Sequence, residues 1–103
     1  MNDLILVGAS GGMREILWQL EELNKKQPTW NILGIVDKKI NGEVTEIYNY
    51  PVLGDDGYLL EYGKEINVAI CVGSSSLRKK IVSRLSKNPF ISFPSLIADD
   101  VKI

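Results

Sequence analysis

The sequence contains no histidine, and this absence limits the chemistry that the chain can perform alone. Histidine is the most frequent general acid–base residue in enzymes and a frequent zinc ligand. We therefore expect neither a self-contained hydrolase triad nor a metal site. The single cysteine, Cys71, lies in the apolar stretch NVAICVG, where we expect a buried, inert thiol rather than a nucleophile. One thiol forms no internal disulfide, which is typical of a reducing compartment and predicts a cytoplasmic protein.

Long apolar runs and an excess of one charge are also absent. No stretch approaches the roughly twenty apolar residues of a membrane span, and Met1 to Val7 lack the basic start of a signal peptide. The 12 basic and 13 acidic residues nearly cancel, so a nucleic-acid-binding face is not indicated. We interpret the basic cluster LRKK (77–80) as a solvated helix face. Neither a nucleic acid nor a membrane is therefore expected as a partner.

The sequence does contain a regular alternation of apolar strands and amphipathic helices. Continuous apolar runs predict buried parallel strands over 3–7, 30–36 and 67–72, with shorter strands over 51–53 and 90–93. Helical spacing predicts helices over 13–26 and from 74–76 to 88, and a short one within 54–65. The polar segment 38–50 is expected to be an irregular loop, with a turn at Asn41-Gly42. This alternation predicts an α/β fold, a small doubly wound parallel sheet in a single domain.

Three local signals refine these boundaries. Pro51 permits only an edge strand or the start of a strand, because proline has no backbone N–H. Asp55 or Asp56 is expected to cap the short helix. Gly63 is expected to end it.

The first strand runs into the glycine-rich stretch GASGG (8–12), which precedes a helix. Free N–H groups at a helix start, and the close approach that glycine allows, favour an anion such as a phosphate. Gly8, Ser10, Gly11 and Gly12 are therefore candidate ligand-binding residues. The stretch departs from the dinucleotide fingerprint G-x-G-x-x-G, because Ser10 and Met13 replace its second and third glycines. The alternative is a tight turn without a ligand, although three glycines in five residues exceed what a turn requires.

Further candidates lie where other strands end. Asp37 ends the second strand, where an acid commonly binds ribose hydroxyls, and a turn or helix cap is the alternative. Lys38 either neutralises a phosphate or is simply solvated. Gly73 and Ser74 form a second strand-to-helix junction, and Arg78, in the first turn of the helix that follows, either reaches a phosphate or stays on the surface. Because these positions share the carboxyl edge of the sheet, we expect them to gather there.

The C-terminal stretch SLIADDVKI departs from this pattern. Residues 97–102 fit one turn of a hexapeptide β-helix, and a frayed terminal strand is the alternative. One repeat is not stable alone, so we expect a fragment that stops mid-pattern. The predicted division is a domain at 1–94 and the start of a truncated left-handed β-helix at 95–103.

The stretches LILVGASGG, ILGIVDKK, PVLGDD, VAICVGSSSLRKKI and FPSLIADDVKI together resemble one family in their order and spacing. This family is the N-terminal nucleotide-sugar-binding domain of bacterial sugar acetyltransferases. It includes sialic acid O-acetyltransferases and the bacillosamine-pathway N-acetyltransferase. The resemblance implies a Rossmann-like domain that binds a UDP-type nucleotide sugar. It also implies a following β-helix that trimerises, binds acetyl-CoA and supplies a catalytic histidine.

The resemblance also implies roles for individual residues. Gly8, Ser10, Gly11 and Gly12 contact the diphosphate, Asp37 and Lys38 lie by the nucleoside, and Gly73, Ser74 and Arg78 flank the sugar diphosphate. The β-helix and its histidine are missing from this sequence, and Phe93 stands before Pro94 where the family often has histidine. We therefore expect a fragment that binds the acceptor, needs no cofactor itself and transfers no acetyl group. The parent protein is expected to be a homotrimeric acetyltransferase.

Two other functions stay open at this point. One is an NAD(P)-binding domain of an oxidoreductase or redox sensor, which the residues at the two missing glycine positions disfavour. The other is a ligand-free interaction module. The presence of two glycine-containing strand-to-helix junctions on one sheet edge disfavours it.

Overall fold

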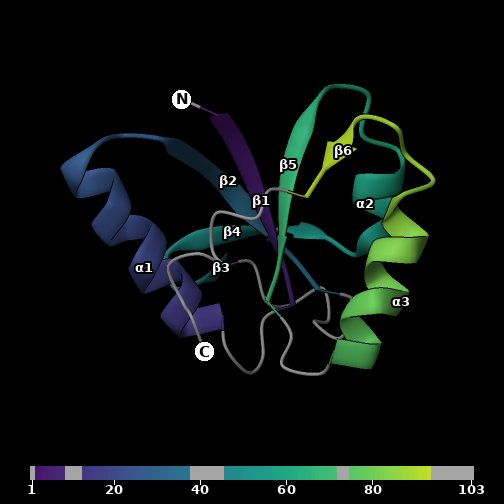
Figure 1. Ribbon diagram of the computed structural model, residues 1–103, viewed down its shortest axis with the longest axis horizontal. Coiled ribbons are helices and arrows are strands. Elements are labelled where there is room, and N and C mark those ends of the chain that lie inside the picture. Colours follow the sequence, from purple (N-terminus) through teal and green to yellow (C-terminus); the bar gives the residue numbers. More distant parts are fainter. Residues whose placement is uncertain (1, 9–12, 38–45, 72–74, 94–103) are drawn as a thin grey trace.

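The computed structural model describes residues 2–8, 13–37, 46–71 and 75–93, which build one sheet flanked by helices (Figure 1). The strands are β1 (Asn2–Val7), β2 (Trp30–Val36), β3 (Glu46–Ile47), β4 (Tyr50–Gly54), β5 (Ile66–Ile70) and β6 (Ile91–Ser92). The helices are α1 (Met13–Lys26), α2 (Asp56–Leu60) and α3 (Ser75–Leu85). The sheet order is β3-β4-β2-β1-β5-β6, and only the β3–β4 pair is antiparallel. Its five parallel strands follow the 3-2-1-4-5 order of a doubly wound fold, which confirms the predicted Rossmann-like class.

The two faces of the sheet pack against different helices. Side chains alternate along β1, so Leu4 and Leu6 join the apolar cluster beneath α1, whereas Ile5 and Val7 face α2 and α3. Figure 1 accordingly shows α1 on one side of the sheet and α2 and α3 on the other. Burial on both faces explains why the central strands have continuous apolar runs.

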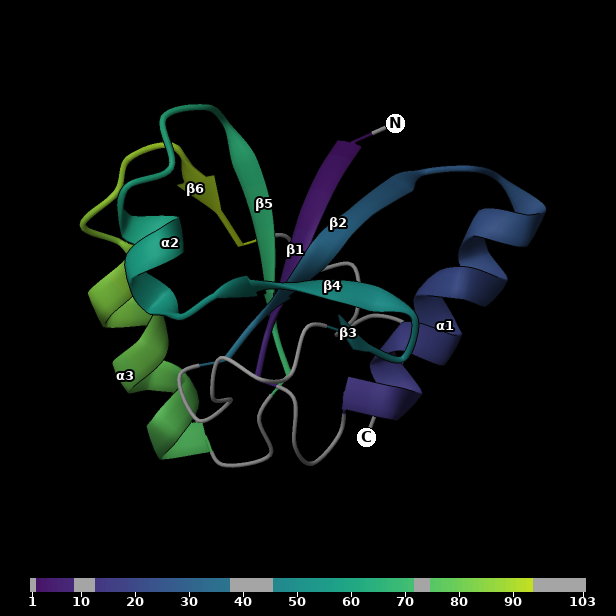
Figure 2. The same ribbon diagram turned by 180° about the vertical axis from the view of Figure 1, so that it is seen from behind.

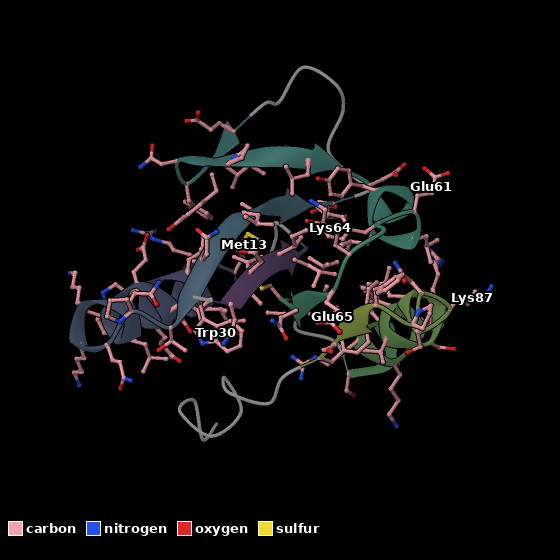
Figure 3. All side chains as sticks on the ribbon, turned by 90° about the horizontal axis from the view of Figure 1, so that it is seen from above. Met13, Trp30, Glu61, Lys64, Glu65 and Lys87 are labelled. Atoms are coloured by element: carbon pink, nitrogen blue, oxygen red, sulfur yellow. The ribbon has the colours of Figure 1, made fainter. Side chains whose placement is uncertain are left out.

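Helix α1 forms as its sequence pattern predicts. Its apolar residues recur at helical spacing, and Met13, Leu17 and Leu20 are buried against the sheet. Lys25 and Lys26 lie in the last turn, where their positive charges interact favourably with the negative end of the helix dipole. Figure 3 labels Met13 near the centre of the molecule, and its side chain belongs to the apolar cluster beneath α1. Among the described residues, none of the helices has the length and apolar character required to cross a bilayer.

The prediction of an irregular loop over 38–50 is wrong at its C-terminal end, where β3 pairs with β4 in a hairpin. The two turn residues, Tyr48 and Asn49, have φ angles of 50° and 71°, which suit a two-residue hairpin turn. The Tyr50 hydroxyl donates a hydrogen bond to Glu21 Oε2 at 2.8 Å and ties this hairpin to α1. Figure 2 shows the β3–β4 hairpin beside α1. Tertiary contacts therefore order a segment whose polar sequence carries no strand pattern.

The signals around α2 are confirmed in part. Asp55 is the N-cap, and its Oδ1 accepts a hydrogen bond from the Gly57 N–H at 3.0 Å. The prediction that Gly63 ends the helix is wrong, because α2 ends at Leu60 with Glu61 as its C-cap.

Pro51 lies near the start of β4, as its missing N–H requires. The ladder to β2 begins one residue later, at Val52. Strand β4 is nevertheless not at the sheet edge, because β3 pairs with its other side. The turn predicted at Asn41-Gly42 and the tail at 94–103, with its β-helix repeat, lie outside the described residues.

Asn88, between α3 and β6, is buried and joins two loops on the α2–α3 side of the sheet. Its Nδ2 donates hydrogen bonds to the carbonyl oxygens of Leu59 at 2.8 Å and Tyr62 at 2.9 Å. Its Oδ1 accepts a hydrogen bond from the Phe90 N–H at 2.9 Å. This amide therefore links the end of α2 to the segment that enters β6.

Candidate functional site

Backbone hydrogen bonds hold the carboxyl ends of four parallel strands in one row. The bonds run from Cys71 N–H to the Val7 oxygen at 2.7 Å, from Gly8 N–H to the Val36 oxygen at 2.9 Å, and from Asp37 N–H to the Gly54 oxygen at 3.1 Å. Figure 1 shows the ends of β1, β2 and β5 at the same end of the molecule as the starts of α1 and α3. The predicted site residues Gly8 and Asp37 therefore lie on neighbouring strands.

The order of the strands reverses between β1 and β5. The chain leaves β1 through α1 to reach β2 on one side, and it leaves β5 through α3 to reach β6 on the other. Doubly wound sheets bind their ligands at this point, outside the carboxyl ends of the strands. Gly8, which follows β1 here, is buried and has a φ of 94°, a conformation that residues other than glycine rarely adopt.

Arg78 lies near the start of α3, at a position that shares a helical face with Ile81, Val82 and Leu85. Positions 78, 81, 82 and 85 share one helical face, because residues three and four apart are neighbours. Leu85 is fully buried and Ile81 packs against the same cluster, yet the first position of this stripe is an exposed arginine. Arg78 is thus the one cation among these four positions. It lies at the end of α3 that is close to the carboxyl edge of the sheet.

The thiol of Cys71 lies at the same edge but is not a nucleophile. Burial raises the pKa of Cys71 to about 12, although the positive charge of Arg78 and a backbone hydrogen bond from Val7 both lower that pKa. The thiol is thus protonated at neutral pH, as the sequence predicts. The effect of Arg78 on this pKa also links its guanidinium to the end of β5.

The remaining predicted site residues, Ser10, Gly11, Gly12, Lys38, Gly73 and Ser74, lie outside the described residues. The structure thus brings together Gly8, Asp37 and Arg78, and the roles of the other six stay predictions from the sequence. Within the described parts of the chain, no group of three acidic, cysteine or histidine side chains is arranged to hold a metal ion.

One residue at this edge was missed by the sequence analysis. Tyr58, on α2, is 38% exposed and packs against Gly54 at the end of β4. From the sequence alone, Tyr58 is only one apolar residue of a short predicted helix. Its close packing against Gly54 depends on the fold and cannot be read from the sequence.

A hollow lies at the opposite edge of the sheet, where β1 and β5 begin. Asp3, Glu65, Asn67 and Ser92 line part of it. Asp3 accepts hydrogen bonds from two asparagines. Asn31 Nδ2 donates to the Asp3 Oδ1 at 3.0 Å, and Asn67 Nδ2 donates to the Asp3 carbonyl oxygen at 3.1 Å. None of the predicted site residues lines this hollow, so the carboxyl edge remains the candidate site.

The profile of a protein family described as the PglD N-terminal domain matches residues 3–85, from β1 to the end of α3. The chain belongs to this family. The PglD N-terminal domain is the N-terminal domain of PglD-type sugar acetyltransferases, which confirms the resemblance seen in the sequence. Comparisons with curated proteins and with solved structures returned no match.

Proposed function

We propose that this PglD N-terminal domain binds the nucleotide-sugar acceptor, of UDP type, of an acetyl-CoA-dependent sugar acetyltransferase. The observation that carries the proposal is the convergence of Gly8, Asp37 and Arg78 on one sheet edge, at the point where the strand order reverses. Membership of the PglD family supports the acceptor class. The glycine turn leads to a helix start that favours phosphate, and Asp37 is one strand away, where a ribose would lie.

The proposed roles follow the order of these residues along the edge. Gly8, Ser10, Gly11 and Gly12 are assigned to contact the diphosphate. Asp37 accepts hydrogen bonds from the ribose hydroxyls, and Lys38 lies by the nucleoside. Arg78 provides the positive charge for the sugar diphosphate, with Gly73 and Ser74 beside it.

Acetyl transfer itself is assigned to the β-helix of the parent homotrimer, where acetyl-CoA supplies the acetyl group. The residues gathered at the described edge suit an anionic acceptor, and none of them is assigned to acetyl-CoA. The chain also has no histidine to deprotonate an acceptor amine or hydroxyl. The domain alone is therefore expected to bind the acceptor without acetylating it.

Calorimetric titration with UDP, a UDP-amino sugar and NADH tests this proposal. We expect the uridine ligands to bind and the Gly11→Val variant to lose that binding, because a side chain there blocks close approach of the phosphates. Gly63→Val is the matched control, since a Cβ added at Gly63 meets no atom within 4 Å. Tight binding of NADH with no response to uridine ligands would refute the proposal and favour a dinucleotide domain.

A second pair of variants tests the role of the arginine. Arg78→Gln is expected to weaken UDP binding by about 10- to 150-fold, since hydrogen bonds to charged groups contribute roughly 1.5–3 kcal/mol. Lys87→Gln, which removes an exposed cation beyond the other end of α3, is the control. Equal affinities of the two variants would remove Arg78 from the site.

A further inference from the structure

Tyr58 is an exposed aromatic residue at the start of α2, held in place from two directions. Its N–H donates a hydrogen bond to the Asp55 carbonyl oxygen at 3.0 Å, in the capped first turn of the helix. Its ring lies 5.8 Å from the ring of Tyr62, centroid to centroid, at an angle of 49°. The residue is nevertheless 38% exposed, so this large aromatic side chain is partly open to solvent.

Gly54, at the end of β4, packs closely against Tyr58. Gly54 ends β4 with a φ of 149°, and a Cβ built on it lies 3.3 Å from Tyr58 Cβ and 3.9 Å from the Cγ and Cδ2 atoms of the ring. A larger residue at Gly54 would be strained and would push the tyrosine away. The Gly54 carbonyl oxygen also accepts the hydrogen bond from the Asp37 N–H. Tyr58 therefore packs against the strand end whose backbone is hydrogen-bonded to the Asp37 N–H.

Tyr62 does not share this position, although it lies four residues away. Burial raises the pKa of Tyr62, and the nearby Tyr58 and the negative charge of Asp3 raise it further. Asp3 lies near the start of β1, at the opposite edge of the sheet. The rings of Tyr62 and Tyr58 contact each other, and the effect of Asp3 relates Tyr62 to the opposite edge of the sheet.

We infer that Tyr58 is the stacking platform for the base of the nucleotide, an inference that rests on the proposed function. Neighbouring strands lie about 4.8 Å apart, so the ends of β1, β2 and β4 form three evenly spaced positions. A nucleoside diphosphate presents its phosphates, ribose and base in that same order. With the phosphates at Gly8 and the ribose at Asp37, the base reaches the end of β4, where the ring of Tyr58 is exposed.

Calorimetric titration of the chain with UDP tests this inference. Stacking of one base on an aromatic side chain contributes roughly 1–3 kcal/mol, so Tyr58→Ala is expected to weaken UDP binding by about 5- to 150-fold. Tyr58→Phe keeps the ring and is expected to bind as the unchanged chain does. Tyr58→Leu fills the space over Gly54 without a flat ring, and we expect it to lose as much affinity as Tyr58→Ala while keeping the packing.

A control and a second readout separate stacking from a structural role. Trp18→Ala removes a ring that is 62% exposed on α1, across the sheet, and is expected to leave UDP binding unchanged. In proton NMR spectra, the uracil ring protons should shift upfield on binding to the unchanged chain and to Tyr58→Phe, but not to Tyr58→Leu. Unaltered affinity in Tyr58→Leu, or a full loss in Tyr58→Phe, would overturn the stacking role and leave the proposed function intact. Failure of the unchanged chain to bind any uridine nucleotide would overturn both.

Discussion

Replacing Asn88 with alanine removes a side chain that carries three hydrogen bonds inside the protein. The lost bonds run to the Leu59 and Tyr62 carbonyl oxygens and from the Phe90 N–H, at 2.8–2.9 Å. Each such bond contributes about 1 kcal/mol, and a buried group left without a partner costs about 1–3 kcal/mol. The Leu59 oxygen keeps a second donor, the Tyr62 N–H at 3.2 Å, which limits the damage at that atom. We therefore expect Asn88→Ala to lower the free energy of unfolding by about 2–4 kcal/mol.

Urea unfolding followed by far-ultraviolet circular dichroism measures this loss. With a slope of about 1–3 kcal/mol per molar urea, a loss of that size moves the midpoint by roughly 0.7–4 M. Asn67→Ala is the matched control, because Asn67 donates one exposed hydrogen bond, to the Asp3 carbonyl oxygen, and its loss is expected to cost less than about 1 kcal/mol. If the two variants unfold at the same urea concentration, the three bonds of Asn88 contribute nothing beyond an ordinary surface contact and the reasoning fails.

Two further predictions concern packing and alkaline pH. A Cβ built at Gly34 lies 2.6 Å from the Pro51 carbonyl oxygen, so Gly34→Ala is expected to lower stability by about 1–3 kcal/mol in urea titrations, whereas Gly63→Ala changes little. A stable Gly34→Ala variant would mean that β2 and β4 separate without penalty. Burial, the hydrogen bond to Glu21 and the charge of that carboxylate raise the pKa of Tyr50 from 10.0 to about 12. The unfolded chain then loses this proton first, so stability that is present below pH 10 is lost as the pH rises towards 12, and Tyr50→Phe should reduce that slope. Identical slopes for both proteins in thermal melts between pH 9 and 12 would contradict this account.

The central architecture could be predicted from the sequence because its signals are local. Continuous apolar runs identify strands buried on both faces, and they place β1, β2 and β5 correctly to within two residues. The residues at their carboxyl ends then follow from topology alone, since parallel strands end at one edge. Gly8 and Asp37 were predicted in this way, and the row of hydrogen bonds places them on adjacent strands.

The parts that escaped prediction depend on contacts between distant residues. Strand β3 forms in a polar segment because it pairs with β4, while Glu21, from α1, binds Tyr50. Asn88 reads in the sequence as a helix stop before Pro89, and its bonds to the end of α2 appear only in the fold. Arg78 did carry a readable signal, since it shares the helical face of Ile81, Val82 and Leu85, but the sequence alone does not say where that face meets the sheet.

The row of hydrogen bonds at the carboxyl edge also determines which atoms remain for recognising an anion. The N–H groups of Gly8, Asp37 and Cys71 already donate to the neighbouring strand, so none of them is left for an incoming phosphate. The contribution of Gly8 is then its backbone conformation. Its φ of 94° is one that a D-amino acid adopts readily and an L-amino acid avoids. Donors for the ligand must come from side chains and from residues beyond each strand end. Ligand preference in such a domain is thereby free to diverge through its loops while the hydrogen-bonded framework of the sheet stays constant.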